Sequence, residues 1–305
     1  EGSFVDETHV CVKTATGEEV LACDGVIVAT GSEAFFPPPF DAIKDQIYDN
    51  STIFEMEQLP QSLTIIGGGV IGCEMADLLS ALGVQVSVVE MQPRILPTED
   101  ETAARTLYQA LSKRGIVFYT GVSATKAEKT DAGFKVALSD GKEISAQKIL
   151  AAIGRSVNAS SLHLENIGVS FTRKGVQVNP QTMQLKNNVY AAGDVTGLLL
   201  LAHAATRQGE VAASNLCGVA AQYHNELIPR AVYTSPEIAS VGLTRSQAQA
   251  RGLNVRAQKS FFLANGRAVA QEQTEGYVEL FSETDSGRLV GGTMVGAHAA
   301  ELIHV

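Results

Sequence analysis

Three glycines in the stretch Thr64–Glu74, TIIGGGVIGCE, have the GxGxxG spacing that can hold a dinucleotide. Gly67 would allow a tight turn, Gly69 would let a pyrophosphate approach the backbone, and Gly72 would let a helix pack closely on a strand. The N–H groups at the start of that helix would then face the phosphate charge. A glycine-rich turn without a ligand is the alternative, because the motif alone is a weak signal.

An acidic residue follows at the distance that such a site needs. Glu90 ends the apolar stretch VQVSVVE, about 20 residues after the glycines, where a carboxylate can accept hydrogen bonds from ribose hydroxyls. A carboxylate repels a 2′-phosphate, so Glu90 favours NAD over NADP. Arg94 is close in sequence and leaves NADP open as the alternative.

Two further stretches place small or acidic residues after apolar strands. YAAGDV puts Asp194 beyond a strand end, where its carboxylate could accept hydrogen bonds from a polyol, although turn and helix-cap aspartates look the same. ATGS, Ala29–Ser32, closes the apolar run GVIVATG and would allow close backbone approach. Glu74 is expected in the first helical turn, where the helix dipole alone favours an acid.

The apolar pattern predicts the elements that position these residues. We expect a strand over SLTIIGG and then a helix that ends at Gly83. After the strand VQVSVVE, a capping box that begins at Thr98 predicts a helix to about Arg114. DAG and DG turns then separate the segments of an antiparallel meander. The helix after the glycines should pack through one face, made of Ile71, Met75, Leu78, Leu79 and Leu82.

Composition limits the classes of function. The chain has 33 acidic and 23 basic residues, a formal net charge of −10, which argues against nucleic acid or an anionic membrane as the main partner. No apolar run approaches the roughly 20 residues that span a bilayer. The four cysteines are scattered without disulfide or zinc spacing, so a reduced, cytoplasmic protein without a metal is expected. A missing initiator Met and an abrupt end suggest a fragment of a longer protein.

Seven stretches, in order and nearly end to end, resemble the pyridine nucleotide–disulfide oxidoreductases. They are VIVATGS; TIIGGGVIGCE with VVE; AAIGR; NVYAAGDV; LLAHAA; IPRAVYTSPEIASVGLT; and ANGRAVAQEQTEGYVEL with GGTMVGAHAAELI. The resemblance implies an α/β protein with two Rossmann-like, three-layer domains that bind FAD and NAD(P), one of them partial, plus a truncated α+β dimerisation domain. It implies four segments: 1–45, the tail of the first FAD segment; 46–153, the NAD domain; 154–225, the second FAD segment; and 226–305, the interface domain.

The same resemblance implies roles for residues that match the family's motifs. Thr30, Gly31 and Ser32 would lie near FAD, Asp194 would bind its ribitol, and the flavin would be lined by Leu200, Leu201, Ala202 and His203. The residues expected to contact NAD are Gly67, Gly68, Gly69, Val70, Ile71, Gly72, Glu74, Glu90 and Gly154. Cys73, between them, is expected to be a small apolar filler.

The resemblance also implies an activity. Family members that oxidise dihydrolipoamide pass its electrons through FAD to NAD, act as homodimers and can serve lipoyl-bearing subunits of 2-oxoacid dehydrogenase complexes. The family's redox pair CxxxxC and catalytic HxxxxE match no stretch of this chain, so we expect no catalytic residue here and an inactive isolated chain. Members that reduce mercuric ion or exchange hydride between soluble nicotinamide nucleotides are alternatives, as is a nucleotide-binding relative without a redox centre. A mitochondrial location stays open.

Overall fold

The computed structural model describes residues 1–304, which form two compact units. The first unit combines Glu1–Phe35 with Arg155–Ile228, and the second combines Phe36–Gly154 with Pro229–Val305. The chain passes from the first unit to the second between Phe35 and Phe36, within the stretch FFPPPF (Phe35–Phe40), whose proline cluster is typical of a linker. Each unit is thus built from two segments that are distant in sequence.

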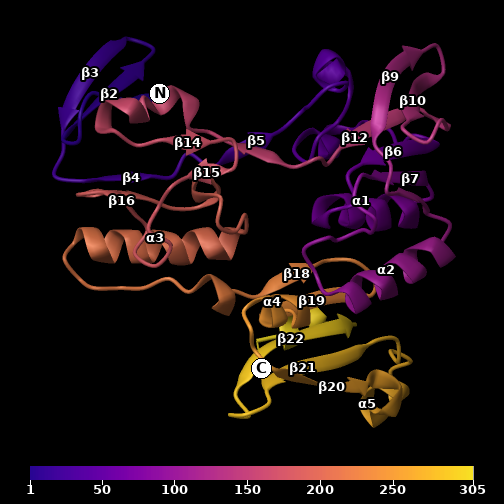
Figure 1. The fold of residues 1–305 in the computed structure, drawn as a ribbon. Coiled ribbons are helices and arrows are strands. Elements are labelled where there is room, and N and C mark those ends of the chain that lie inside the picture. Colours follow the sequence, from indigo (N-terminus) through magenta and orange to yellow (C-terminus); the bar gives the residue numbers. More distant parts are fainter. Residues whose placement is uncertain (305) are drawn as a thin grey trace. The chain divides into compact units, whose positions relative to one another are not determined.

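Small sheets make up the first unit, together with the helix α3 (Ala202–Leu216) (Figure 1). Strand β17 pairs in parallel with β4 and antiparallel with β16, and β1, β2 and β3 form an antiparallel meander. The strands are β1 (Gly2–Phe4), β2 (His9–Thr14), β3 (Gly17–Ala22), β4 (Val26–Val28), β5 (Ser32–Ala34), β13 (Arg155–Val157), β14 (Phe171–Thr172), β15 (Gly175–Val176), β16 (Gln184–Lys186) and β17 (Val189–Ala191).

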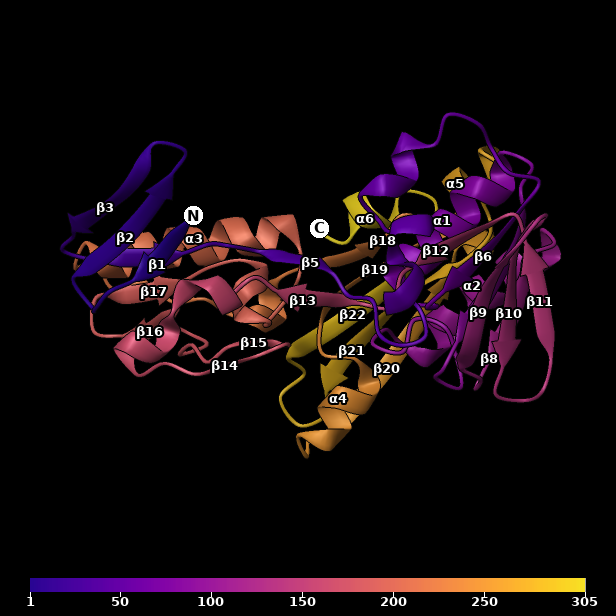
Figure 2. The same ribbon diagram turned by 90° about the horizontal axis from the view of Figure 1, so that it is seen from above.

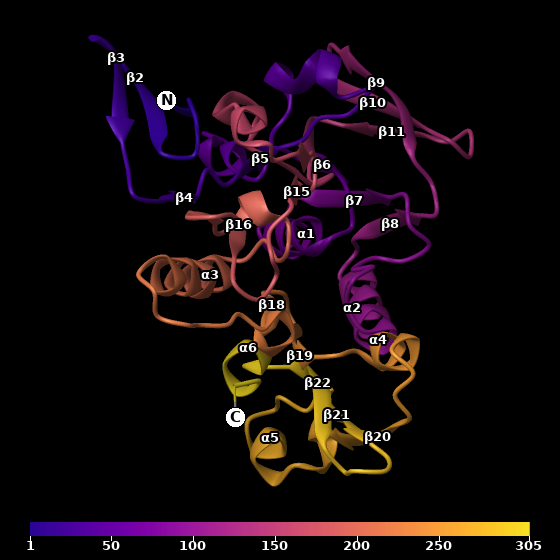
Figure 3. The same cartoon turned by 60° about the vertical axis from the view of Figure 1, so that its left-hand side comes forward.

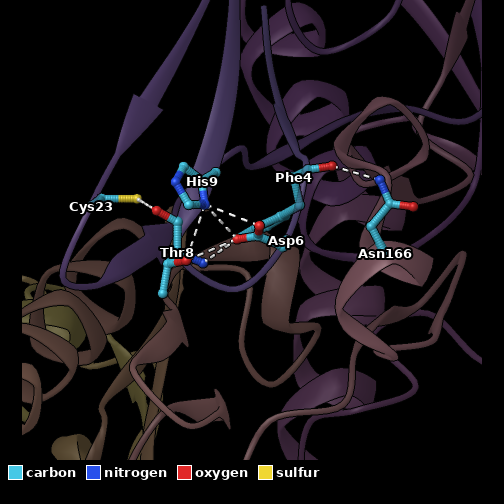
Figure 4. A network of polar contacts seen from close by, with 6 residues as sticks. All are labelled: Phe4, Asp6, Thr8, His9, Cys23 and Asn166. Carbon is cyan, nitrogen blue, oxygen red and sulfur yellow. Dashed lines mark hydrogen bonds and ion pairs between the residues drawn. The ribbon is translucent and has the colours of Figure 1, made fainter.

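The turn between β1 and β2 is organised by one carboxylate (Figure 4). Asp6 Oδ1 accepts the backbone N–H of Thr8 at 2.8 Å and lies 3.0 Å from His9 Nδ1. The Thr8 N–H and the His9 ring together lower the pKa of Asp6 to about 2. Asn166 Nδ2 donates to the Phe4 carbonyl at 2.7 Å and so ties this meander to the later segment of the same unit.

In the second unit, the elements from β6 to β12 form a Rossmann-like half with a parallel sheet in the order β12-β6-β7-β8. Helices α1 and α2 cover one face and an antiparallel meander, β11-β10-β9, covers the other (Figures 1 and 2). The elements are β6 (Ser62–Ile66), α1 (Val70–Ala81), β7 (Gln85–Glu90), α2 (Glu101–Lys113), β8 (Val117–Thr120), β9 (Ala124–Thr130), β10 (Gly133–Leu138), β11 (Glu143–Ala146) and β12 (Lys148–Ala151). This sheet confirms the predicted α/β class.

Alternating side chains of the sheet explain these two layers. Leu63, Ile65 and Val88 are completely buried against the helices. Ile66 and Ile149 point the other way and pack with the meander. Both faces of the strands β12, β6 and β7 are therefore largely buried, as is usual for parallel sheets, whereas the edge strand β8 is partly exposed.

The predicted packing face of α1 is only partly right. Leu79 is buried and Met75 packs against the core as predicted, but the helix also buries the small residues Gly72, Cys73 and Ala76. Leu78 and Leu82, which the pattern assigned to the core, are 42% and 54% exposed. Small residues face the sheet because the helix approaches it closely, so large apolar residues are displaced to the outer face.

The predicted end of α1 is confirmed, whereas the predicted start of α2 is wrong. Gly83 follows α1 with φ +88°, a conformation that glycine adopts without strain, which confirms it as the stop. The capping box at Thr98 is wrong, because the N-cap of α2 is Asp100, whose side chain accepts from the N–H groups of Thr102 and Ala103. A carboxylate one residue before the helix caps it as well as a threonine would.

Residues 229–304 complete the second unit with an antiparallel sheet in the order β18-β19-β22-β21-β20 (Figure 3). The predicted α+β character of this segment is confirmed. Its elements are β18 (Arg230–Val232), β19 (Glu237–Gly242), α4 (Arg245–Ala250), β20 (Val255–Phe261), α5 (Gly266–Ala270), β21 (Tyr277–Glu283), β22 (Leu289–Gly296) and α6 (Ala299–Leu302). The short 3₁₀ helices of both units are Asp41–Gln46, Thr52–Glu55, Ser160–Leu162, Leu164–Ile167, Asp194–Thr196, Asn225–Leu227 and Phe262–Ala264. Within residues 1–304, no helix is long and apolar enough to cross a bilayer.

Candidate functional site

The glycine turn lies between the end of β6 and the start of α1. Gly67 has φ +108°, and a Cβ there would lie 2.2 Å from the carbonyl oxygen of Ala152. A Cβ at Gly72 would lie 1.9 Å from the Gly67 oxygen. Both positions therefore require glycine for the fold itself, as the sequence predicts for a tight turn and a close helix–strand approach.

The middle glycine is different. A Cβ at Gly69 would meet no atom of residues 1–304 within 4 Å, and its φ of −74° suits any residue. The fold does not need glycine there, so the open space above it is available to a ligand. This is the position at which a pyrophosphate would approach the backbone.

The start of α1 is also available to an anion. Gly69 is its N-cap, and no side chain within the described chain accepts from its first N–H groups, whereas Asp100 caps α2. Uncapped N–H groups and the helix dipole together favour negative charge. Val70 and Ile71, both expected near NAD, form this first turn.

Glu90 lies directly behind the glycine turn. Its Oε2 accepts the Gly68 N–H at 2.6 Å and its Oε1 accepts the Gln92 N–H at 2.7 Å, and only 8% of the residue is exposed. Each oxygen keeps a lone pair with which it can accept a further hydrogen bond from a hydroxyl. A fixed carboxylate at this point can bind a ribose diol and opposes a phosphate.

Arg94 is engaged elsewhere in the same loop. Its Nη1 donates to the carbonyls of Ile95 and Leu96, at 3.3 and 2.5 Å, and its Nη2 donates to those of Pro97 and Glu99, at 2.9 and 3.0 Å. A guanidinium bound to four carbonyls has little donor capacity left for a 2′-phosphate. The sequence alone could not show this, because the acceptors are backbone atoms.

Glu74 is not in the first turn of α1, which corrects the prediction. The helix begins at Val70, so Glu74 lies in the second turn, where its Oε1 accepts the Tyr233 N–H at 2.9 Å. Burial raises its pKa above the ordinary value. Its neighbour Asp77 accepts the Ser235 N–H at 2.8 Å, so both acids fasten α1 to the start of the C-terminal sheet.

Gly154 and Cys73, also expected in this region, differ in burial. Gly154 is exposed with φ +121°. Cys73 is completely buried, its Sγ lies 3.4 Å from the Gly68 oxygen, and burial raises its pKa. The prediction that Cys73 is an apolar filler agrees with this burial.

The residues expected near FAD come together in the first unit. Ser32 Oγ donates to Asp194 Oδ2 at 2.5 Å, and Arg155 Nε donates to Ser32 Oγ at 2.6 Å and lies 3.6 Å from the same carboxylate. Thr30 Oγ1 donates to the Asn158 carbonyl at 2.5 Å, and Gly31 has φ +68°. The sequence predicts no role for Arg155, the last residue of AAIGR, because its partner Asp194 is distant in sequence.

Residues Leu200 to His203 lie at the start of α3. Leu201 is the N-cap, and Ala202 and His203 are the first two helical residues, both exposed. From the same helix, the fully buried Gln208 accepts the Gly193 N–H at 2.8 Å. Gln208 thereby fixes the backbone next to Asp194, a role that sequence reasoning also missed.

The cysteines and the possible metal ligands of residues 1–304 are scattered. The cysteines Cys11, Cys23, Cys73 and Cys217 are all free thiols. Within the part of the chain that the structure describes, no group of three or more His, Cys, Asp or Glu side chains could hold a metal ion. The described residues thus offer nucleotide-binding features and no thiol pair.

Comparison with known proteins identifies the class. Residues 2–209 match the family model described as pyridine nucleotide-disulphide oxidoreductase, and residues 228–305 match the dimerisation domain of the same family. The first match alone covers more than half of the chain. The chain therefore belongs to the pyridine nucleotide-disulphide oxidoreductase family.

Particular relatives are similar over the whole chain. A dihydrolipoyl dehydrogenase of Bacillus subtilis (strain 168) is 37% identical over 99% of this chain and 66% of its own length. A second, from Chlamydia muridarum, is 36% identical over 99% of this chain and 65% of its length. The chain thus spans just under two thirds of these curated relatives.

Solved structures agree in fold. The crystal structure of LpdA from Mycobacterium tuberculosis is 31% identical, with a TM-score of 0.92 over 100% of this chain and 68% of its own. The HOCl-induced flavoprotein disulfide reductase RclA from Escherichia coli is 23% identical, with a TM-score of 0.88 over 100% of this chain and 70% of its own. At that identity the second likeness shows the fold alone.

Proposed function

We propose that this chain carries the NAD site and part of the FAD site of a disulfide oxidoreductase that acts as the dihydrolipoyl dehydrogenases do. The reaction would oxidise dihydrolipoamide to lipoamide, with loss of two electrons and two protons, while NAD⁺ takes up a hydride and one proton is released. The observation that carries the proposal is the glycine turn, in which Gly67 and Gly72 are required by the fold and Gly69 is left open beside the buried Glu90.

The NAD site would be formed by the second unit. The first turn of α1 would hold the pyrophosphate above Gly69, and the free lone pairs of Glu90 would accept hydrogen bonds from a ribose diol. Gly154, after β12, would approach the other end of the nucleotide. We assign Glu74 a supporting role, since its carboxylate accepts the Tyr233 N–H.

The FAD site would be formed in part by the first unit. Asp194 would accept hydrogen bonds from the ribitol, oriented by Ser32 and by the positive charge of Arg155. Thr30 and Gly31 would approach the cofactor through the backbone, and the Leu200–His203 turn would line the flavin. When bound, FAD supplies the electron relay and NAD the hydride acceptor, while the protein binds, orients and excludes water.

The organisation of the parent protein follows the same proposal. Segments 1–45 and 154–225 would belong to the FAD domain, 46–153 to the NAD domain and 226–305 to the interface domain of a homodimer. Lipoyl-bearing subunits of a 2-oxoacid dehydrogenase complex would be further partners. Four free thiols suit a reducing compartment, and we place the protein in the cytoplasm, with the mitochondrial matrix as the alternative.

Titration of the purified chain with NADH, followed by nicotinamide fluorescence, tests the proposal. We expect saturable binding and no flavin absorption band, because only part of the FAD site is present, and no turnover of dihydrolipoamide. Absence of NADH binding would refute the NAD site. A tightly held flavin would refute the partial FAD site.

A further inference from the structure

The loop between β7 and α2 lies directly against the glycine turn. The Leu96 N–H donates to the Gly68 carbonyl at 2.8 Å, and the Ile95 Cγ2 would lie 3.1 Å from a Cβ built on Gly68. Ile95 and Leu96 are 1% and 0% exposed. Gly68 is therefore held from two sides, by Glu90 at its N–H and by Leu96 at its carbonyl.

The loop of residues 94–99 contains a strained backbone conformation. Leu96 has φ +47°, a left-handed conformation that costs a leucine free energy and persists only where its surroundings impose it. Four carbonyls of the loop, those of Ile95, Leu96, Pro97 and Glu99, accept from the Arg94 guanidinium. Arg94 supplies the partners that this conformation requires.

The far end of the loop is fixed as well. Glu99 is 5% exposed, its Oε2 accepts from Ser240 Oγ at 2.8 Å, and its Oε1 lies 3.5 Å from Arg230 Nε. The Glu99 N–H donates back to the Leu96 carbonyl at 3.1 Å. The loop is thus tied to the C-terminal sheet at one end and to the glycine turn at the other.

We propose that Arg94 is a positioning residue of the nucleotide site: its guanidinium shapes the loop of residues 94–99, whose Leu96 amide holds the Gly68 carbonyl and so keeps the glycine turn in its binding conformation. This inference rests on the proposed NAD site and adds a residue to it. Arg94 does not act through charge on a 2′-phosphate, although its position next to Glu90 in sequence suggests that role.

Three variants distinguish the effect of Arg94 on the loop conformation from the effect of its positive charge. Arg94→Ala removes the guanidinium, and Arg94→Lys keeps the positive charge but cannot donate to four carbonyls in a planar fan. Arg105→Ala is the matched control, because the exposed Arg105 on α2 lines the same cavity of about 220 Å³ as Arg94. Affinities for NADH and NADPH are measured for each by fluorescence titration, and hydrogen exchange is followed at residues 94–99.

We expect both Arg94 variants to bind NADH about 10- to 100-fold more weakly, because loop carbonyls lose their donors and the glycine turn loses its support. Their ratio of NADH to NADPH affinity stays near that of the wild type, and exchange rises at the Leu96 amide while strand β6 stays protected. Arg105→Ala binds as the wild type does.

Other outcomes overturn the inference. If Arg94→Ala loses affinity for NADPH alone and Arg94→Lys restores it, Arg94 binds phosphate. If neither variant changes NADH affinity or the exchange of the Leu96 amide, Arg94 positions nothing. If the wild type itself does not bind NADH, the proposed function fails with it, and that result is distinct from the other two.

Discussion

Replacing Gly69 by alanine tests whether this glycine serves ligand binding or the stability of the fold. The backbone at Gly69, with φ −74° and ψ −168°, accepts an alanine, and the new methyl would meet no atom of the described residues within 4 Å. Losing a glycine also restricts the unfolded chain, so the free energy of unfolding should stay equal or rise by about 0.4–1 kcal/mol.

A bound dinucleotide would meet that methyl. Forcing one methyl group into a well-packed contact costs about 1–3 kcal/mol, which corresponds to an affinity loss of about 5- to 150-fold. Gly69→Ala should therefore weaken NADH binding without loss of stability. Gly72→Ala should lose both NADH affinity and stability, because its Cβ would lie 1.9 Å from the Gly67 oxygen.

The assay is an NADH fluorescence titration paired with urea denaturation of the same samples. Gly209→Ala is the control, since Gly209 lies in α3, where a Cβ also meets no described atom within 4 Å. That variant should gain stability and bind NADH unchanged. Unchanged NADH affinity in Gly69→Ala would refute the reasoning, as would a loss of stability equal to that of Gly72→Ala.

Three further predictions concern charge and burial. Glu90→Ala leaves the buried Gly68 N–H without an acceptor, so the free energy of unfolding should fall by about 1–3 kcal/mol and NADH should bind more weakly. Glu90→Gln keeps an acceptor and should lose less in a denaturation series; equal losses for the two variants would contradict this account. Burial raises the pKa of the Glu74 carboxyl, so the protonated form stabilises the fold below pH 4.5 and this stabilisation is lost as the pH rises through the folded-state pKa. Glu74→Gln removes the buried negative charge and should therefore stabilise the chain at higher pH. Melting curves should therefore show a gain at pH 7–8 that vanishes below pH 4.5, and a gain independent of pH would argue against it. A thiol reagent should modify the exposed Cys217 in the folded chain and Cys73 only after unfolding, because burial raises the pKa of Cys73 and blocks access; rapid reaction of Cys73 in the native state would contradict its placement.

The features that the sequence predicted well depend on local backbone geometry. The order of strands and helices around the glycine turn, the stop at Gly83 and the roles of Gly67 and Gly72 follow from spacing and from conformations that glycine alone adopts easily. The sequence pattern presents KEISAQKILAAIG as a single segment of the meander, but the structure divides it at Gln147: β11 pairs with β10, and β12 lies next to β6 in the parallel sheet. No local signal in the sequence marks this change of sheet.

The features that it missed depend on partners distant in sequence or on backbone acceptors. Glu74 accepts a hydrogen bond from Tyr233, 159 residues away, so its place in the helix said nothing of its contact. Arg94 binds carbonyls that only the folded loop brings together. On α1, counting large apolar residues assigned the exposed Leu78 and Leu82 to the core, because it overlooked that close packing on the sheet selects the small residues Gly72, Cys73 and Ala76.

A crystal structure of this chain grown with NADH tests the central claim most directly. The account predicts the pyrophosphate above Gly69 at the start of α1 and the adenosine ribose within hydrogen-bond distance of Glu90. Density for the nucleotide at any other place, or a glycine turn that stays empty at saturating NADH, would contradict it.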